Sequence, residues 1–171
     1  MAYLNKALLL TAAIALGACS TDADRFGDGS GTPAAGQFDN GGLGDPNDPT
    51  SLAYFQQTVG DRVLFVVDQS TLTPQAMVTL DEQASWLANN PEFTAIIEGH
   101  ADERGTREYN LALGARRASA AQDYLVSRGV APGRLRTVTY GKERPLEICS
   151  DEACYSQNRR AVTVLTAGLT G

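Results

Sequence analysis

Runs of β-branched and aromatic residues alternate with longer segments of helical apolar spacing, and this alternation most restricts how the chain can fold. The β-rich runs are residues 62–67, 93–99, 135–141 and 159–166, and helical periodicity occupies 75–90 and 106–129. The order β-α-β-α-β-(α)-β favours an α+β or α/β sandwich, with the helices packed on one mixed, four-stranded sheet. Right-handed crossovers would bring the first three strands partly into parallel.

Turn and cap residues mark the ends of these elements. Thr73-Pro74 is typical of an N-cap followed by proline at the first helical position. Asn90-Pro91 should end the first helix, and Gly129 the second. Met77, Leu80, Ala84 and Leu87 stand at helical spacing in the first helix. Leu113, Arg117, Ala121 and Leu125 share one face of the second.

The N-terminus has the pattern of a cleaved export signal, which we assign to residues 1–18. Lys6 is followed by the apolar run ALLLTAAIALGA, which is too short to span a bilayer. The run ends in Leu16-Gly17-Ala18-Cys19, which resembles the lipobox of bacterial lipoproteins. That resemblance implies acylation of Cys19, and Ser20 behind it favours the outer membrane. An ordinary secretory signal with an incidental cysteine is the alternative.

Residues 19–50 would be the lipidated N-terminus and a flexible linker, because 27–49 are rich in Gly, Pro and Asp and lack apolar periodicity. The folded domain would then be residues 51–171, which suffice for one core. The net charge of −6 argues against nucleic acid as a partner, since such binding needs clustered Lys and Arg.

Cys149 and Cys154 are the two remaining cysteines. An exported protein meets an oxidising compartment, so we expect a disulfide that closes a short local loop. A zinc half-site is the competing interpretation, but the sequence has no second cysteine pair and its one histidine is distant.

The stretch EGHADERGTREYN, residues 98–110, gathers acidic and basic side chains around His100. It could be a polar strand-to-helix connection in which Asp102 or Thr106 caps the second helix. A metal site lacks a remote ligand, and no nucleophile motif accompanies the histidine, so we expect neither metal nor cofactor. In the third interpretation Asp102 accepts from a ligand ammonium and Arg117 binds its carboxylate, as a zwitterion requires.

Several strings in this region are similar to a known family. EGHADERGT, EYN, LGARRA, TYGKERP and NRRAV resemble the OmpA-like C-terminal domains, and more narrowly the peptidoglycan-associated lipoproteins of the Tol–Pal system. The resemblance covers residues from about Val63 to Val164, and the lipobox agrees with it.

This resemblance implies noncovalent binding to the meso-diaminopimelate of the peptidoglycan stem peptide. It assigns the ligand to Asp102 and Arg117, and further contacts to Arg104, Thr106, Leu113 and Asp68. The last assignment departs from the family pattern, which commonly reads FDFD followed by another acid. Here the string is Phe65-Val66-Val67-Asp68, and the alternative for Asp68 is a turn residue at a strand end.

The resemblance also implies a setting. The protein would be held in the outer membrane by lipid on Cys19, face the periplasm, and bind TolB and the Tol complex during outer-membrane invagination at cell division. An OmpA-like wall-binding lipoprotein with a motor or secretion partner is the alternative. A wall hydrolase would need a carboxylate pair or a metal in a cleft, so we expect no enzyme. We interpret Asn158-Arg159-Arg160 as a turn with arginines paired to acids beside the sheet.

Overall fold

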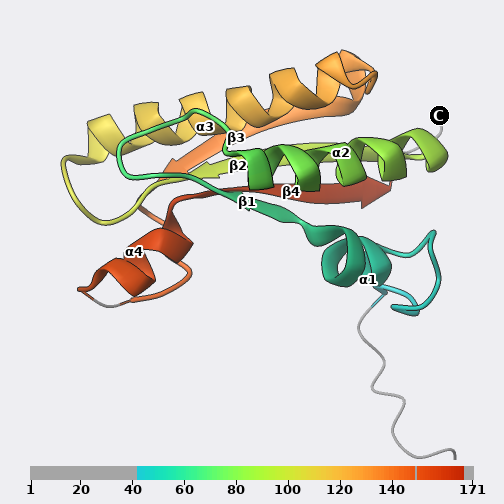
Figure 1. The fold of residues 1–171 in the computed structure, drawn as a ribbon, viewed down its shortest axis with the longest axis horizontal. Coiled ribbons are helices and arrows are strands. Elements are labelled where there is room, and N and C mark those ends of the chain that lie inside the picture. Colours follow the sequence, from blue (N-terminus) through green and yellow to red (C-terminus); the bar gives the residue numbers. More distant parts are fainter. Residues whose placement is uncertain (1–41, 149, 168–171) are drawn as a thin grey trace, which may run out of the picture. The chain divides into compact units, whose positions relative to one another are not determined.

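The computed structural model describes residues 42–148 and 150–167. Its strands are β1 (Arg62–Leu64), β2 (Phe93–His100), β3 (Leu135–Gly141) and β4 (Arg160–Ala167), and they lie in the order β1-β4-β2-β3. Strand β2 pairs in parallel with β3, and β4 runs antiparallel to both β1 and β2. The first three strands therefore point the same way and end at one edge of the sheet (Figure 1). The predicted sandwich is confirmed.

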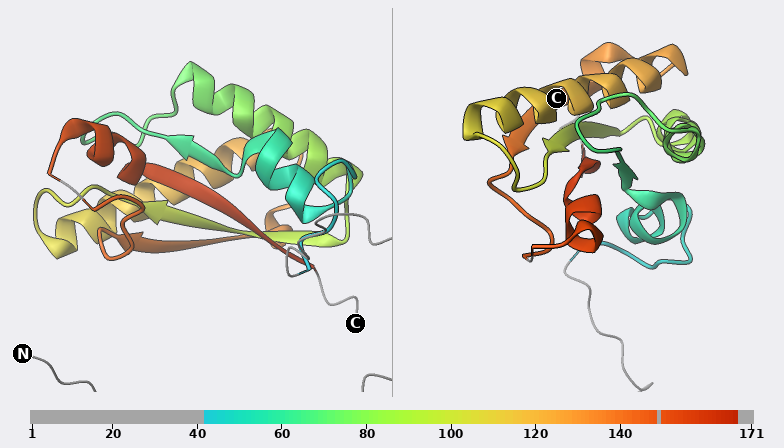
Figure 2. Two further views of the ribbon diagram at one scale, coloured as in Figure 1. Left: turned by 90° about the horizontal axis from the view of Figure 1, so that it is seen from below. Right: turned by 60° about the vertical axis from the view of Figure 1, so that its left-hand side comes forward.

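Helices α2 (Pro74–Asn89) and α3 (Arg107–Ser127) cover one face of this sheet (Figure 2). The predicted cap of α2 is confirmed, because Thr73 Oγ1 accepts from Ala76 N at 3.1 Å. Thr106 Oγ1 accepts from Tyr109 N at 3.2 Å, so Thr106, rather than Asp102, caps α3. Just beyond α3, Gly129 has a φ of +98°, which glycine adopts more readily than other residues.

The core lies between these helices and the sheet. All four residues predicted to share one face of α3 are buried. In α2, Leu80, Ala84 and Leu87 are buried, whereas Met77 is 37% exposed and Gln83 is fully buried. Gln83 Nε2 donates to Gly60 O and its Oε1 accepts from Thr163 Oγ1, both at 2.7 Å. Burial of this amide is tolerated because both of its ends are bonded.

Strand β1 is shorter than the predicted run of residues 62–67. The amide of Phe65 still donates to Arg159 O at 2.9 Å, but the next carbonyl, of Val66, accepts from Gln69 N in a turn. Asp68 then adopts a φ of +59°. The chain leaves the sheet at this point because its backbone groups bond to a turn instead of to β4.

A short helix that the sequence did not predict precedes β1. Helix α1 (Leu52–Tyr54) continues into a π-helical turn, Phe55–Gly60. Trp86 Nε1 donates to Pro49 O at 2.7 Å, and Ala53 N donates to Leu43 O at 2.9 Å. Contacts with the domain thus begin upstream of the start predicted at Ser51. Residues 1–41, which include the predicted signal, Cys19 and most of the linker, lie outside the described residues.

Helix α4 (Glu152–Asn158) stands where the sequence suggested a short helical turn before the last strand. The side chain of Asp151 caps it by accepting from Cys154 N at 3.1 Å. Cys154 lies in α4, but Cys149 is outside the described residues, so the disulfide stays a prediction. No helix of the described part is long and apolar enough to cross a membrane.

Two glycines bring α3 against the sheet. A Cβ atom on Gly99 in β2 would stand 1.9 Å from Gly114 O in α3, and one on Gly114 would stand 2.5 Å from Thr139 Oγ1 in β3. Helix and sheet therefore touch backbone to backbone at this crossing. Arg117 follows Gly114 by one turn, so this contact places Arg117 near the end of β2.

Candidate ligand site

A pocket of about 530 Å³ opens where β1 and β2 end. Five of the six predicted ligand residues line it, namely Asp68, Asp102, Arg104, Leu113 and Arg117, together with Val67, Gly105, Tyr109 and Asn110. The sixth, Thr106, does not line the pocket and instead caps α3. Residues up to 50 positions apart in the sequence, Val67 and Arg117, thus meet at one edge of the sheet.

Arg117 is fully buried and holds three backbone carbonyls. Its Nε donates to Gln69 O at 2.8 Å, Nη1 to His100 O at 2.8 Å, and Nη2 to Val66 O at 3.2 Å. The side chain therefore fixes the turn after β1 to the end of β2. Burial lowers the pKa of Arg117 to about 10, so the guanidinium stays charged near neutral pH.

These bonds leave part of the guanidinium uncommitted. An arginine has five N–H donors, and the three carbonyls use one each on Nε, Nη1 and Nη2. One N–H on Nη1 and one on Nη2 remain among the described contacts. That is the pair a two-point contact with a carboxylate requires.

Asp102 is also nearly buried, with 7% of the residue exposed. Its Oδ2 accepts from Arg104 Nη2 at 2.7 Å and from Arg159 Nη1 at 3.2 Å, and its Oδ1 accepts from the amide of Arg104 at 3.2 Å. Burial raises the pKa of the Asp102 carboxyl, but hydrogen bonds from Arg104 and Arg159 outweigh it, and the net pKa lies below the ordinary value.

The lowered pKa of Asp102 determines how its contribution to stability depends on pH. Since the folded-state pKa is depressed, the stability that Asp102 contributes is present above its ordinary pKa of about 3.9. It is lost as the pH falls through the lowered folded value. Asp102 therefore carries its charge through the neutral range.

Arg104 and Asp68 are two of the exposed residues that line the pocket. The Arg104 side chain is 46% exposed, lies over the Tyr155 ring at 4.7 Å, and approaches Glu152 Oε2 at 3.7 Å. Asp68 Oδ1 accepts from the Tyr109 hydroxyl, which joins the turn after β1 to the first turn of α3. Tyr109 was not predicted as a site residue, although it stands in the EYN string.

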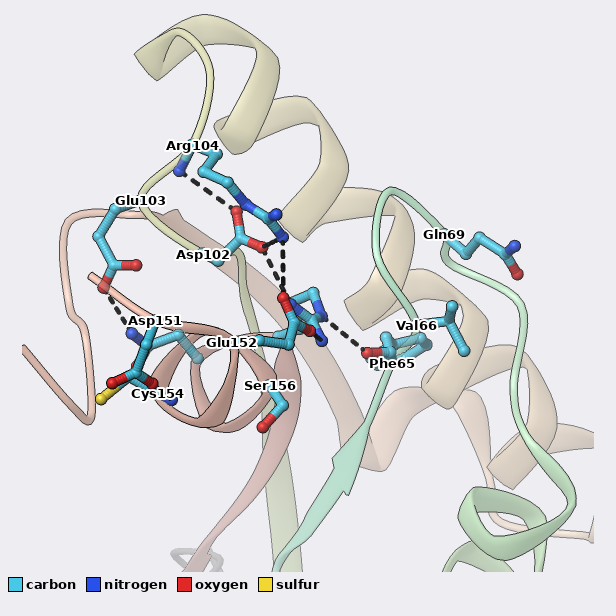
Figure 3. Close-up of polar contacts among 12 residues, drawn as sticks. Phe65, Val66, Gln69, Asp102, Glu103, Arg104, Asp151, Glu152, Cys154 and Ser156 are labelled. Atoms are coloured by element: carbon cyan, nitrogen blue, oxygen red, sulfur yellow. Dashed lines mark hydrogen bonds and ion pairs between the residues drawn. The ribbon is translucent and has the colours of Figure 1, made fainter. Parts of the chain in front are cut away.

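The sequence also missed the contribution of the last strand and α4. Arg159 and Arg160 were predicted to pair with acids beside the sheet, but their burial, at 5% and 7% exposed, was not predicted. Arg159 pairs with Asp102 and with Glu152 of α4, whereas Arg160 donates to the carbonyls of Asn158 and Arg144. In Figure 3, Asp102 and Arg104 face Glu152. Helix α4 therefore lies beside the site and reaches Arg104 and Arg159 through Glu152, but its residues are not among those that line the pocket.

Asn158 links the loop after β2 to the segment that precedes α4. It is fully buried, and its Oδ1 accepts from the amides of Leu146 and Glu147 at 2.7 and 3.1 Å. Its Nδ2 donates to Glu103 Oε1 at 2.5 Å. Glu103 is thus tied to the frame of the loop. Glu108 is exposed and is therefore a better control position than Glu103 for variants of the site.

His100 lies behind the site at the end of β2 and is 1% exposed. Its ring centroid lies 5.6 Å from that of Tyr140, and Nε2 is 3.6 Å from Glu98 Oε2, longer than a hydrogen bond. Burial lowers the pKa of His100 to about 4, and the charges of Arg160 and Arg144 act in the same direction. His100 is neutral at neutral pH and is not among the residues that line the pocket.

We expect His100 to set a pH-dependent stability. Because its folded pKa lies below the ordinary 6.5, its contribution is complete above pH 6.5 and is lost as the pH falls towards 4. The loss should reach about 3 kcal/mol of unfolding free energy. Urea unfolding between pH 7 and 4 measures it. The His100→Gln variant should show a flatter curve between pH 6.5 and 5, and an unchanged slope there would contradict the assignment.

Within the described ranges, 42–148 and 150–167, no cluster of three or more His, Cys, Asp or Glu residues could hold a metal ion. The arrangement of charges at the pocket is instead one of fixed, paired groups. It offers a hydrogen-bond acceptor and a guanidinium in one cavity, which is suited to an organic zwitterion.

Comparison with known proteins gives a consistent picture. A model of the OmpA family matches residues 64–159. A peptidoglycan-associated lipoprotein of Rhizobium meliloti is 61% identical over 117 residues, which are 68% of this chain and 66% of that protein. One of Agrobacterium fabrum is 47% identical over 162 residues, covering 94% of this chain and 88% of that protein.

Solved structures support the same fold. The crystal structure of the peptidoglycan-associated lipoprotein from Burkholderia pseudomallei matches with a TM-score of 0.64 and 40% identity, covering 72% of this chain and 98% of that one. The C-terminal domain of Helicobacter pylori MotB matches with a TM-score of 0.59 and 18% identity, covering 64% and 86%. The second match concerns the fold alone.

Proposed function

The chain belongs to the OmpA family and, within it, to the peptidoglycan-associated lipoproteins, and from that premise we propose that it binds peptidoglycan noncovalently through the free end of meso-diaminopimelate. That end carries an ammonium and a carboxylate on one carbon atom. The observation that carries the proposal is that Asp102 and Arg117 line one pocket.

The remaining hydrogen-bonding capacity of both residues fits this ligand. A carboxylate accepts about four hydrogen bonds, and three sites of Asp102 are taken, which leaves one on Oδ1 for the ammonium. The two free N–H groups of Arg117 would bind the carboxylate. Leu113 supplies an apolar wall for the methylene chain between the two ends of diaminopimelate.

Sedimentation with purified sacculi tests the proposal. The full-length protein in mild detergent should co-sediment, and free meso-diaminopimelate should release it. Sacculi in which lysine replaces diaminopimelate are the matched control, because lysine lacks the distal carboxylate. If both kinds of sacculi bind the protein equally, the ligand is not the diaminopimelate zwitterion.

At its other end the protein would be held in the outer membrane by lipid on Cys19, with its domain facing the periplasm. The predicted signal and the name of the relatives, lipoprotein, support this. TolB and the Tol complex would be its protein partners, in outer-membrane integrity and in invagination at cell division. An OmpA-like lipoprotein with a motor or secretion partner is the second candidate. Co-purification with TolB distinguishes the two.

Replacing Cys19 should abolish lipid attachment. We expect the Cys19→Ser precursor to remain unprocessed or to be misplaced, because the sulfur that would carry the diacylglycerol is gone. Metabolic labelling with palmitate, followed by immunoprecipitation, measures the effect. Equal labelling of parent and variant would overturn the lipobox interpretation.

A further inference from the structure

Arg159 joins three segments of the chain next to the site. Its Nε donates to Phe65 O at 3.2 Å, its Nη1 to Asp102 Oδ2 at 3.2 Å, and its Nη2 to Glu152 Oε1. These partners belong to the end of β1, the loop after β2, and α4. The Arg159 side chain is 6% exposed, so this contact is built into the fold.

Asp102 thus has two arginine partners of different kinds. Arg104, at 46% exposure, is largely in solvent, and exposed ion pairs contribute little and exchange readily. Arg159 is buried, and a buried carboxylate that loses its partner is strongly destabilised. Arg159 is therefore the buried counter-charge of Asp102, and it bonds to Oδ2, which it shares with Arg104.

The same side chain also reaches the other half of the site. Phe65, whose carbonyl Arg159 holds, precedes Val66, whose carbonyl accepts from Arg117. The Arg159 guanidinium thus holds both Asp102 and the backbone next to Val66, to which Arg117 donates. The distance between Asp102, which would accept from the ammonium, and Arg117, which would bind the carboxylate, therefore depends on Arg159.

We infer that Arg159 is a positioning residue: it holds the Asp102 carboxylate charged and oriented, with Oδ1 turned to the ligand ammonium, and sets its spacing from Arg117. This inference rests on the proposed function of the pocket. Arg159 itself does not line the pocket that holds Asp102 and Arg117, so its effect on a ligand must act through Asp102 and the backbone.

A double-mutant cycle tests the inference on the full-length protein. Sacculus affinity is measured for the parent, Asp102→Asn, Arg159→Met and the double variant. Arg159→Met alone should weaken binding at least tenfold. The loss should be much smaller when Asp102 is already neutralised, because only the part that acts through the backbone near Arg117 then remains. An equal loss in both backgrounds, or no loss at all, would make Arg159 merely structural.

Arg160→Met is the matched control. Arg160 is the next residue, it is 7% exposed, and its bonds go to backbone carbonyls. Its replacement should show no coupling to Asp102→Asn. Should Arg160 couple as strongly as Arg159, the assignment of a specific role to Arg159 fails.

A second measurement needs no ligand. Carbon NMR of the Asp102 carboxyl follows its titration, and Arg159→Met should raise the midpoint, since a hydrogen bond that lowers the pKa of Asp102 is removed. Arg159→Lys, which keeps a charge but reaches fewer partners, should titrate between parent and Arg159→Met. If Arg159→Met does not fold, Arg159→Lys takes its place in the double-mutant cycle. An unchanged midpoint in both variants would overturn the inference.

The two levels of the argument fail separately. If Asp102→Asn binds sacculi like the parent, the proposed function is wrong. If Asp102→Asn loses binding but shows no coupling to Arg159, the site stands and only the positioning role falls.

Discussion

Asp102→Asn and Arg117→Lys should each weaken binding to sacculi at least thirtyfold. Losing one charged partner in a largely desolvated site costs about 2–5 kcal/mol, and about 1.4 kcal/mol is a factor of ten. Lysine at position 117 can still donate to carbonyls, but it cannot make a planar two-point contact with a carboxylate. Sedimentation at several protein concentrations gives the affinity.

The choice of variants follows from the burial of both residues. Arg117→Ala would leave three carbonyls without their donor, at about 1–3 kcal/mol each, and could unfold the domain. Arg116→Lys is the matched control, because Arg116 is the exposed neighbour on the same helix. Glu108→Gln serves the same purpose for Asp102. If the folded Asp102→Asn and Arg117→Lys proteins both sediment like the parent, residues 98–110 form only a helix cap.

Gly99→Ala should lower the free energy of unfolding by about 3 kcal/mol, a large part of the 5–15 kcal/mol typical of a domain. Its Cβ would stand 1.9 Å from Gly114 O, so α3 must move away from β2. Urea denaturation followed by circular dichroism measures the loss.

Gly133→Ala provides the comparison for this glycine. A Cβ there meets nothing within 4 Å, and the backbone is not in the left-handed region. Alanine should leave stability unchanged or raise it slightly, by restricting the unfolded chain. If Gly99→Ala unfolds at the same urea concentration as the parent, α3 can move away from β2 without loss of stability, and the prediction is wrong.

Local signals explain why most elements were predictable. Period-2 and period-3.6 patterns gave four strands and two long helices to within a few residues, and Thr73 was recognisable as a cap because a proline follows it. The end of β1 was not predictable, since residues 65–67 have good strand composition. The Val66 carbonyl accepts from Arg117 and from the Gln69 amide, and the Phe65 carbonyl accepts from Arg159. The two arginine contacts are ones that no local pattern encodes.

The site, like the fold, was predictable only in part. The resemblance of HAD and RRA to a known family indicated Asp102 and Arg117, and the structure brings them to one pocket. It gave no hint that Arg159, and not Arg160, pairs with Asp102, because two adjacent arginines look alike in a sequence. Their difference arises from α4, whose Glu152 lies against one of them.

The two ends of β2 determine the direction in which a pulling force would act on the domain. Pro49 is bonded to Trp86, which packs on Phe93 at the start of β2, whereas Asp102 follows the end of that strand. Eight strand residues, about 26 Å, separate the two. In a tether between lipid and wall, tension would run along the strands, so the ladder between β2 and β4 would be loaded in shear. Its hydrogen bonds would then resist together, instead of being peeled apart one after another.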